Sequence, residues 1–239
     1  MEKGLGFNST LRLDWLDKTA SLCCQRLPQP EVRRQLLETL SDSIQGAAVR
    51  KKTLGVLMGI WFKTQTLSPQ LHSEAVRLFP TLPAAEERLW LHYGLALLRY
   101  PLFRSSTRAL GQIGRAQETV TRRQVKERMA GEFGHLGSLD RAVERLLASL
   151  FHWGLLRNGE RKGEYRLMQH SLKAAPAVQL WMIGCALTAH PAQTLPFNDL
   201  LHLPELFPFQ FSLGVDDLRR AEHIEVQRQG GGLEMVQST

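Results

Sequence analysis

Apolar residues recur at three- and four-residue steps through most of the first hundred positions. Segment 31–44 shows the pattern clearly, with one apolar face made of Val32, Leu36, Leu37, Leu40 and Ile44. The same spacing runs through 11–27, 48–64, 68–80 and 83–101. It is typical of amphipathic helices, and prolines stand near the ends or first turns of these segments. Ser68 is a candidate cap, with Pro69 in the first turn of its helix. Residues 1–103 are therefore predicted to form a helical bundle.

A second group of helices is predicted from residue 119 onward. In TVTRRQVKERMAGEF (119–133), Thr121 precedes Gln124 by three residues, the spacing of a capping box. Ser138 is a candidate cap for the next helix. On a helical wheel the inward face of that helix carries Leu139, Val143, Leu146, Leu147 and Leu150, and its outward face carries Arg141, Glu144, Arg145, Ala148 and His152.

A hairpin is predicted to follow. Residues 155–157 and 165–168 read as strands, and NGERKG (158–163) between them begins with Asn-Gly, a strong turn signal. Two helices and a hairpin in this order are typical of a winged helix-turn-helix, in which the second helix enters the major groove of DNA. Residues 104–168 are therefore predicted to form such a domain.

The distribution of charge favours the same segment. The chain carries a net charge of +7, and residues 104–168 hold thirteen Arg and Lys against seven Asp and Glu, a net of +6. The remainder carries +1. A basic patch on a winged helix indicates an anionic partner, above all double-stranded DNA held through its phosphates. The predicted contacts are Thr121, Arg122, Arg123, Lys126, Ser138, Arg141, Arg145, His152, Arg157, Arg161, Lys162 and Arg166, with Arg50, Lys51 and Lys52 as a secondary phosphate-contacting cluster.

The last segment, 169–239, is less regular. Residues 174–189 read as a buried helix, and 212–224 as another, capped by Ser212 or Asp216. Alternation on both sides of Gly230–Gly232 predicts a terminal hairpin. This helix-then-hairpin order repeats that of 138–168, so the segment could form a second winged-helix-like unit. The fold class is thus mainly α.

The motifs of common enzymes are missing from the sequence. The eight histidines are scattered, no glycine-rich loop ends in Gly-Lys-Ser/Thr, and the acidic pairs 86–87 and 216–217 stand at predicted helix starts. Cys23, Cys24 and Cys185 lack the spacing of a zinc site. We therefore expect neither an enzyme nor a metal or cofactor.

The apolar runs 53–62 and 174–189 are too short to span a bilayer, and the first ten residues do not read as a signal peptide. A cytoplasmic protein without membrane insertion is expected. Two alternatives to DNA binding stay open: a protein-interaction scaffold, and an RNA-binding or transcription-regulating protein acting through the bundle.

The order of GLGFNSTLRLDWLDKTASL, RKKTLGVLMGIW, HYGLALLRYPLFRSS and the 119–156 segment resembles the BrxA family of bacterial BREX phage-defence systems. The resemblance covers residues 1–170 and rests on architecture and loose patterns; the C-terminal part exceeds what the family leads us to expect. It implies a helical part similar to NusB, a winged helix and DNA binding. It also implies work beside a methyltransferase, an ATPase and a phosphatase-like subunit.

Overall fold

In the first hundred residues, the helices of the computed structural model lie close to where the apolar periodicity places them. Residues 6–134 and 137–238 are described. The first part holds α1 (Leu13–Cys24), α2 (Gln29–Ser41), α3 (Ala47–Trp61), α4 (Pro69–Leu78) and α5 (Ala85–Arg99), with 3-10 turns at Lys63–Thr66 and Phe79–Thr81. Pro30 and Pro69 lie in the first turns of α2 and α4, where a missing backbone N–H costs nothing. Ser68 precedes α4 as predicted, but its side chain makes no capping hydrogen bond.

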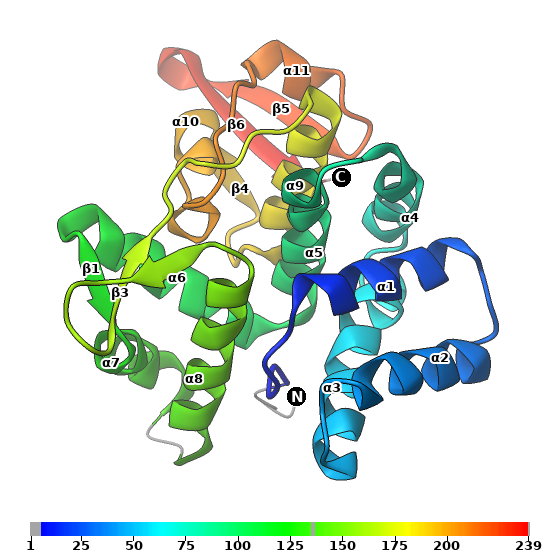
Figure 1. Cartoon of the computed structure of the whole chain (residues 1–239). Helices are drawn as coiled ribbons and strands as arrows, with labels where there is room; N and C mark the ends of the chain where they lie inside the picture. Colours follow the sequence, from blue (N-terminus) through cyan, green and yellow to red (C-terminus); the bar gives the residue numbers. More distant parts are fainter. Residues whose placement is uncertain (1–5, 135–136, 239) are drawn as a thin grey trace.

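The rest of the chain alternates helices and short strands (Figure 1). The middle part holds α6 (Pro101–Ala116), β1 (Thr119–Thr121), α7 (Arg122–Phe133), α8 (Gly137–His152), β2 (Leu156–Asn158) and β3 (Glu164–Leu167). The last part holds α9 (Pro176–Ala189), β4 (Thr194–Pro196), α10 (Phe197–Leu201), α11 (Val215–Arg219), β5 (Ile224–Gln229) and β6 (Leu233–Ser238), with 3-10 turns at Pro204–Leu206 and Gly230–Gly232. The mainly α prediction is confirmed.

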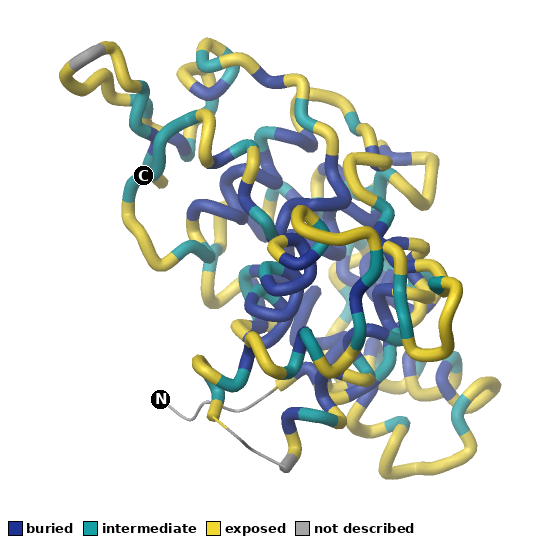
Figure 2. The backbone as a smooth tube through the Cα atoms, turned by 90° about the vertical axis from the view of Figure 1, so that its left-hand side faces the viewer, coloured by how far each residue is buried: buried dark blue, intermediate teal, exposed yellow. Residues whose placement is uncertain are grey.

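The core runs continuously through all three parts of the chain, and its centre is the pair α5 and α9. Nearly every residue of α9 from Val178 to Leu187 is buried, which explains why its apolar residues show no helical period. The two helices approach closely because Gly94 has no side chain: a Cβ there would lie 2.5 Å from Trp181. In Figure 2 the buried residues gather at the centre of the molecule. All five tryptophans are buried.

The structure contains two three-stranded antiparallel sheets, with orders β1-β3-β2 and β4-β6-β5. Both predicted hairpins are present. β2 and β3 begin one residue away from their predicted starts, and β5 and β6 flank the three glycines. The edge strands β1 and β4 were not predicted. Each has three residues and leads directly into a helix.

The two sheets belong to segments with the same order of elements. Residues 101–167 run α6-β1-α7-α8-β2-β3, and residues 176–238 run α9-β4-α10-α11-β5-β6, each with the last strand in the middle of its sheet. The strand-to-helix junction lies between Thr121 and Arg122 in the first and between Pro196 and Phe197 in the second. We call these segments the first unit and the second unit.

One helix of the second unit is shorter than its sequence predicts. The helix expected over 212–224 is reduced to Val215–Arg219. Neither Ser212 nor Asp216 caps it: the residue before the helix is Gly214, whose N–H donates to Asp217 Oδ2 at 2.8 Å. The Ser212 hydroxyl is used elsewhere, accepting a hydrogen bond from the Gln179 side chain at 3.1 Å.

Candidate nucleic-acid interface

Helix α7 starts as its sequence predicts. The Thr121 hydroxyl accepts from the backbone N–H of Gln124 at 3.3 Å, and the Gln124 side chain accepts from the backbone N–H of Thr121 at 2.8 Å. Val125 and Met129 are buried beneath this turn, and Gly134, at φ +72°, ends the helix. Thr121 thus belongs to the capping box, so its hydroxyl is already engaged in the fold.

The cations of α7 are largely paired with carboxylates. Arg122 lies 3.3 Å from Glu144 and 3.8 Å from Asp140 on α8, and Lys126 lies 3.6 Å from Asp140. Arg123 donates to Glu127, one turn along α7, at 2.7 Å. These exposed pairs each contribute little stability, but they lower the charge that α7 offers to a phosphate.

Helix α8 has the inward face predicted for it, since the exposed fraction of its five predicted core residues is zero: Leu139, Val143, Leu146, Leu147 and Leu150. Ser138 is not the cap, because the helix already begins at Gly137 and places Ser138 in its first turn. Arg141, Glu144 and His152 are exposed. Within the described residues, Arg141 has no ion-pair partner.

One edge of α8 is covered by the N-terminal segment, residues 6–12. Arg145 donates to the carbonyl of Asn8, and the buried Ser149 hydroxyl accepts from the N–H of Leu11 at 2.9 Å. Trp153 Nε1 donates to the Leu11 carbonyl at 3.1 Å. In Figure 1 this segment runs between α8 and the bundle. Arg145, which was predicted on the outward face, is half-buried, and its side chain donates to a backbone carbonyl.

The hairpin carries several exposed cations of the first unit. Arg157 and Arg166 are register partners on β2 and β3, and both are exposed. Arg161 and Lys162 are exposed in the turn, which Gly163 closes at φ +85°. Arg166 lies 3.5 Å from Glu118; for Arg157, Arg161 and Lys162 the described residues provide no ion-pair partner.

Thr119 and Glu118 were not singled out from the sequence. Thr119 is the register partner of Arg166 on β1, so it stands beside the arginine pair. The alternation Thr-Val-Thr, with Val120 buried, was the available signal for a strand.

The three cations of the secondary cluster on α3 differ in their contacts. Arg50 donates to the carbonyls of Ile44 and Gln45 at 2.9 and 3.1 Å, which fastens the loop before the helix. Lys51 and Lys52 are exposed. Of the three cations in this cluster, Lys51 and Lys52 have no ion-pair partner among the described residues.

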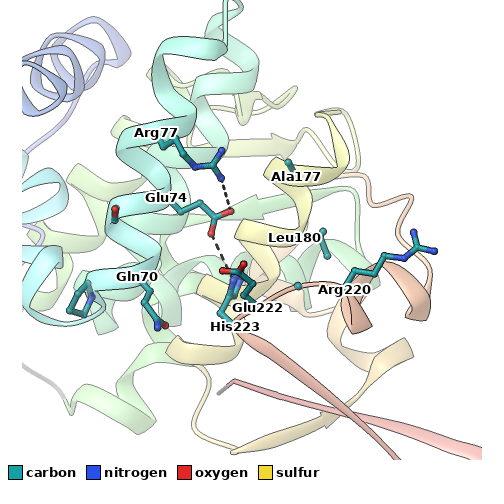
Figure 3. Close-up of a pocket in the computed structure, with 11 residues that line it drawn as sticks. Gln70, Glu74, Arg77, Ala177, Leu180, Arg220, Glu222 and His223 are labelled. Carbon is teal, nitrogen blue, oxygen red and sulfur yellow. Dashed lines mark ion pairs between the residues drawn. The ribbon is translucent and has the colours of Figure 1, made fainter.

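A cavity of about 640 Å³ lies between α4, α9 and the loop before β5 (Figure 3). Three of the residues that line it pair with one another: Glu74 lies 3.5 Å from Arg77 and 3.8 Å from His223. Arg220, which also lines the cavity, lies 4.0 Å from Asp217. Within the described residues, no three His, Cys, Asp or Glu side chains gather as metal ligands, and no helix is long and apolar enough to cross a membrane.

Comparison with known proteins adds no family to this picture. No protein-family model, curated protein or solved structure matches the chain.

Proposed function

We propose that the first unit binds duplex DNA as a winged helix-turn-helix, without catalysis, and holds it chiefly by phosphate contacts. The observation that carries the proposal is the position of the open cations. Arg141 on α8 and Arg157, Arg161 and Lys162 on the hairpin are exposed, and no ion-pair partner is described for them. Helix order, strand order and charge favour one interface made of the second helix and the hairpin.

Phosphate contacts are favoured over base readout by the state of α8. Asp140 and Glu144 lie on this helix beside Arg122 and Lys126, and Arg145 is fastened to Asn8. Few α8 side chains are left to reach base edges, whereas guanidinium groups on a hairpin suit phosphate oxygens. The resemblance of residues 1–170 to the BrxA family supports an accessory subunit of a BREX-type defence system.

The experiment is a salt titration of binding to a labelled duplex, followed by fluorescence anisotropy. Counterion release predicts that affinity falls steeply between about 50 and 200 mM salt. Arg141→Glu combined with Arg161→Glu should weaken binding by tenfold or more and leave thermal stability nearly unchanged, since both residues are exposed. Arg33→Glu is the control for a charge reversal elsewhere, because Arg33 is exposed on α2 at the opposite side of the molecule in Figure 1.

Two results would overturn the proposal. One is a folded wild-type protein that does not retain duplex at about 50 mM salt. The other is equal weakening by the Arg33→Glu control. Competition with single-stranded RNA separates DNA binding from the RNA alternative.

A protein-interaction role is favoured by one further observation. Residues 176–239 carry three Arg and no Lys against seven Asp and Glu, a net of −4. This part repels a polyanion and suits a basic protein surface. Survival of partner co-purification after the Arg141 and Arg161 reversals would support the role, and loss of the partners would contradict it.

A further inference from the structure

The outer face of the first sheet carries a row of three residues in register. Arg166 on the central strand β3 has Thr119 of β1 on one side and Arg157 of β2 on the other. The neighbouring positions Val120, Leu156 and Leu167 are buried, so alternation along the strands puts the row on the opposite, solvent-facing side. We call this set the arginine row.

The arginine row is costly for the isolated fold. Like charges directly opposite each other on adjacent strands are destabilising. Glu118 offsets part of the charge from 3.5 Å, but its side chain is 87% exposed, and among the described residues it pairs with Arg166 and not with Arg157. An anion between the two guanidinium groups would remove this repulsion.

The second unit has a row of residues at the equivalent positions that lacks this positive charge. Matching the strand-to-helix junctions makes Thr119 equivalent to Thr194, and the strand registers then make Arg166 equivalent to Gln237 and Arg157 to Glu225. Val120 and Tyr165 become Leu195 and Val236 by the same match. The inward positions stay apolar in both units, whereas the outward row differs in charge.

The polar side chains of the second row make hydrogen bonds within their own sheet. Gln237 Nε2 donates to Glu225 Oε2 at 2.6 Å, and Gln227 Nε2 donates to Glu225 Oε1 at 2.9 Å. Both carboxylate oxygens therefore have donors within the sheet. The first row has no equivalent closure, since Arg157 has no described ion-pair partner.

We infer that the arginine row is the phosphodiester-binding surface of the first unit, and that the Thr194–Gln237–Glu225 row is its inactive copy. The ligand class follows from the donors. Planar guanidinium forks on adjacent strands match phosphate oxygens, and Arg161 and Lys162 extend the charge beyond the row, as a continuous backbone of phosphates requires. This inference rests on the proposed function and gives the sheet, rather than α8, the main part in binding.

The first experiment replaces Arg157→Gln and Arg166→Gln together. Glutamine is the residue that the second row uses on its central strand, so the sheet should accept it. We expect affinity for the duplex to fall tenfold or more and the slope of log affinity against log salt to flatten by about two. Thermal stability should stay equal or rise, because the cross-strand repulsion is gone. Glu225→Gln is the matched control on the second sheet and should leave affinity within twofold.

The second experiment restores the charge at the other sheet. In the Arg157→Gln/Arg166→Gln background, Glu225→Arg with Gln237→Arg should recover salt-dependent binding, at least in part. Failure of the wild-type protein to bind any duplex sinks the proposed function itself. A wild-type protein that binds, with the double glutamine variant equal to it, overturns only the arginine row. Loss without recovery contradicts the equivalence of the two rows.

Discussion

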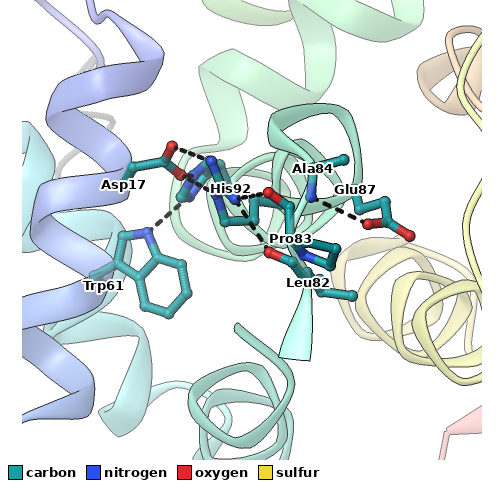
Figure 4. Close-up of polar contacts among 8 residues, drawn as sticks. Asp17, Trp61, Leu82, Pro83, Ala84, Glu87 and His92 are labelled. Carbon is teal, nitrogen blue, oxygen red and sulfur yellow. Dashed lines mark hydrogen bonds and ion pairs between the residues drawn. The ribbon is translucent and has the colours of Figure 1, made fainter. Parts of the chain in front are cut away.

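The imidazole of His92 lies between the Asp17 carboxylate and the Trp61 indole (Figure 4). Its Nε2 is 2.9 Å from Asp17 Oδ1, and its Nδ1 is 3.0 Å from Trp61 Nε1. Because an indole can only donate, Nδ1 accepts and Nε2 carries the proton. Both ring nitrogens are used and the side chain is fully buried, so this Asp–His pair joins α1, α3 and α5 and leaves no nitrogen for proton transfer.

Removing the carboxylate should be costly. Asp17 also accepts two hydrogen bonds of 3.0 Å from Arg88. Asp17→Ala therefore leaves the buried His92 N–H without its acceptor and removes the carboxylate from Arg88, whose Nη1 still donates to the Leu82 and Pro83 carbonyls. We expect the free energy of unfolding to fall by about 2–4 kcal/mol, measured by urea titration followed by tryptophan fluorescence. Asp14→Ala removes an exposed carboxylate of the same helix and should cost less than about 0.5 kcal/mol. Equal losses in the two variants would show that the buried Asp17 network stabilises the protein no more than an exposed carboxylate does.

Stability should depend on pH through His72 and His92. Burial lowers the pKa of both, against hydrogen bonds to the Trp61 carbonyl and to Asp17 that act the other way. The folded state therefore binds fewer protons than the unfolded chain, whose histidines titrate near pH 6.5, about their ordinary value. The stabilisation is complete above that pH and is lost as pH falls toward the lowered folded values. The urea midpoint should drop between about pH 7 and 5, and His72→Gln should flatten this decline. A midpoint that is constant over this range would contradict the assignment of neutral imidazoles.

Most of the predictions that the structure confirms depended on local sequence patterns. The leucine face of α8 and the Thr121–Gln124 capping box depend on residues within a few turns, and both are confirmed. β1 and β4 were missed because an alternation of three residues, such as Thr-Val-Thr in β1, is too short to predict a strand by itself, and because both pair with distant strands. Ser138 was mistaken for a cap because the helix begins one residue before it.

The candidate site was predicted less well, because hydrogen bonds and ion pairs with residues of other segments decide which cations are left unpaired. Arg145 looked free on the helical wheel, yet its partner Asn8 lies 137 positions earlier in the sequence. Arg122 and Lys126 meet carboxylates of another helix for the same reason. The hairpin cations kept their predicted exposure, since a turn at the end of two strands has few neighbours.

The contact between α6 and the Pro204–Leu206 turn should depend on Gly111. A Cβ at this position would lie 1.9 Å from the Pro204 carbonyl oxygen, which is backbone and cannot turn aside. Gly111→Ala should therefore lower the free energy of unfolding by about 1–3 kcal/mol, read from urea unfolding. Gly55→Ala is the matched control: it is exposed in α3 with no atom within 4 Å of the new Cβ. That variant should be stabilised by about 0.5–1 kcal/mol, because alanine is the better helix former. A neutral Gly111→Ala would mean that α6 and the turn separate freely.

The N-terminal segment should be held to α8 by Ser149. Its hydroxyl donates to the Arg145 carbonyl at 2.8 Å and accepts from the Leu11 N–H at 2.9 Å. The same N-terminal segment buries Phe7 and Leu11. Ser149→Ala leaves that N–H buried without an acceptor, so unfolding should become easier by about 1–3 kcal/mol. Hydrogen exchange of the Leu11 amide should accelerate with it. Ser41→Ala removes an exposed hydroxyl that contacts only Glu38 of its own helix and should change stability by less than about 0.5 kcal/mol. If the Leu11 amide exchanges at the wild-type rate in Ser149→Ala, the Trp153–Leu11 hydrogen bond and the burial of Phe7 hold the segment without the serine.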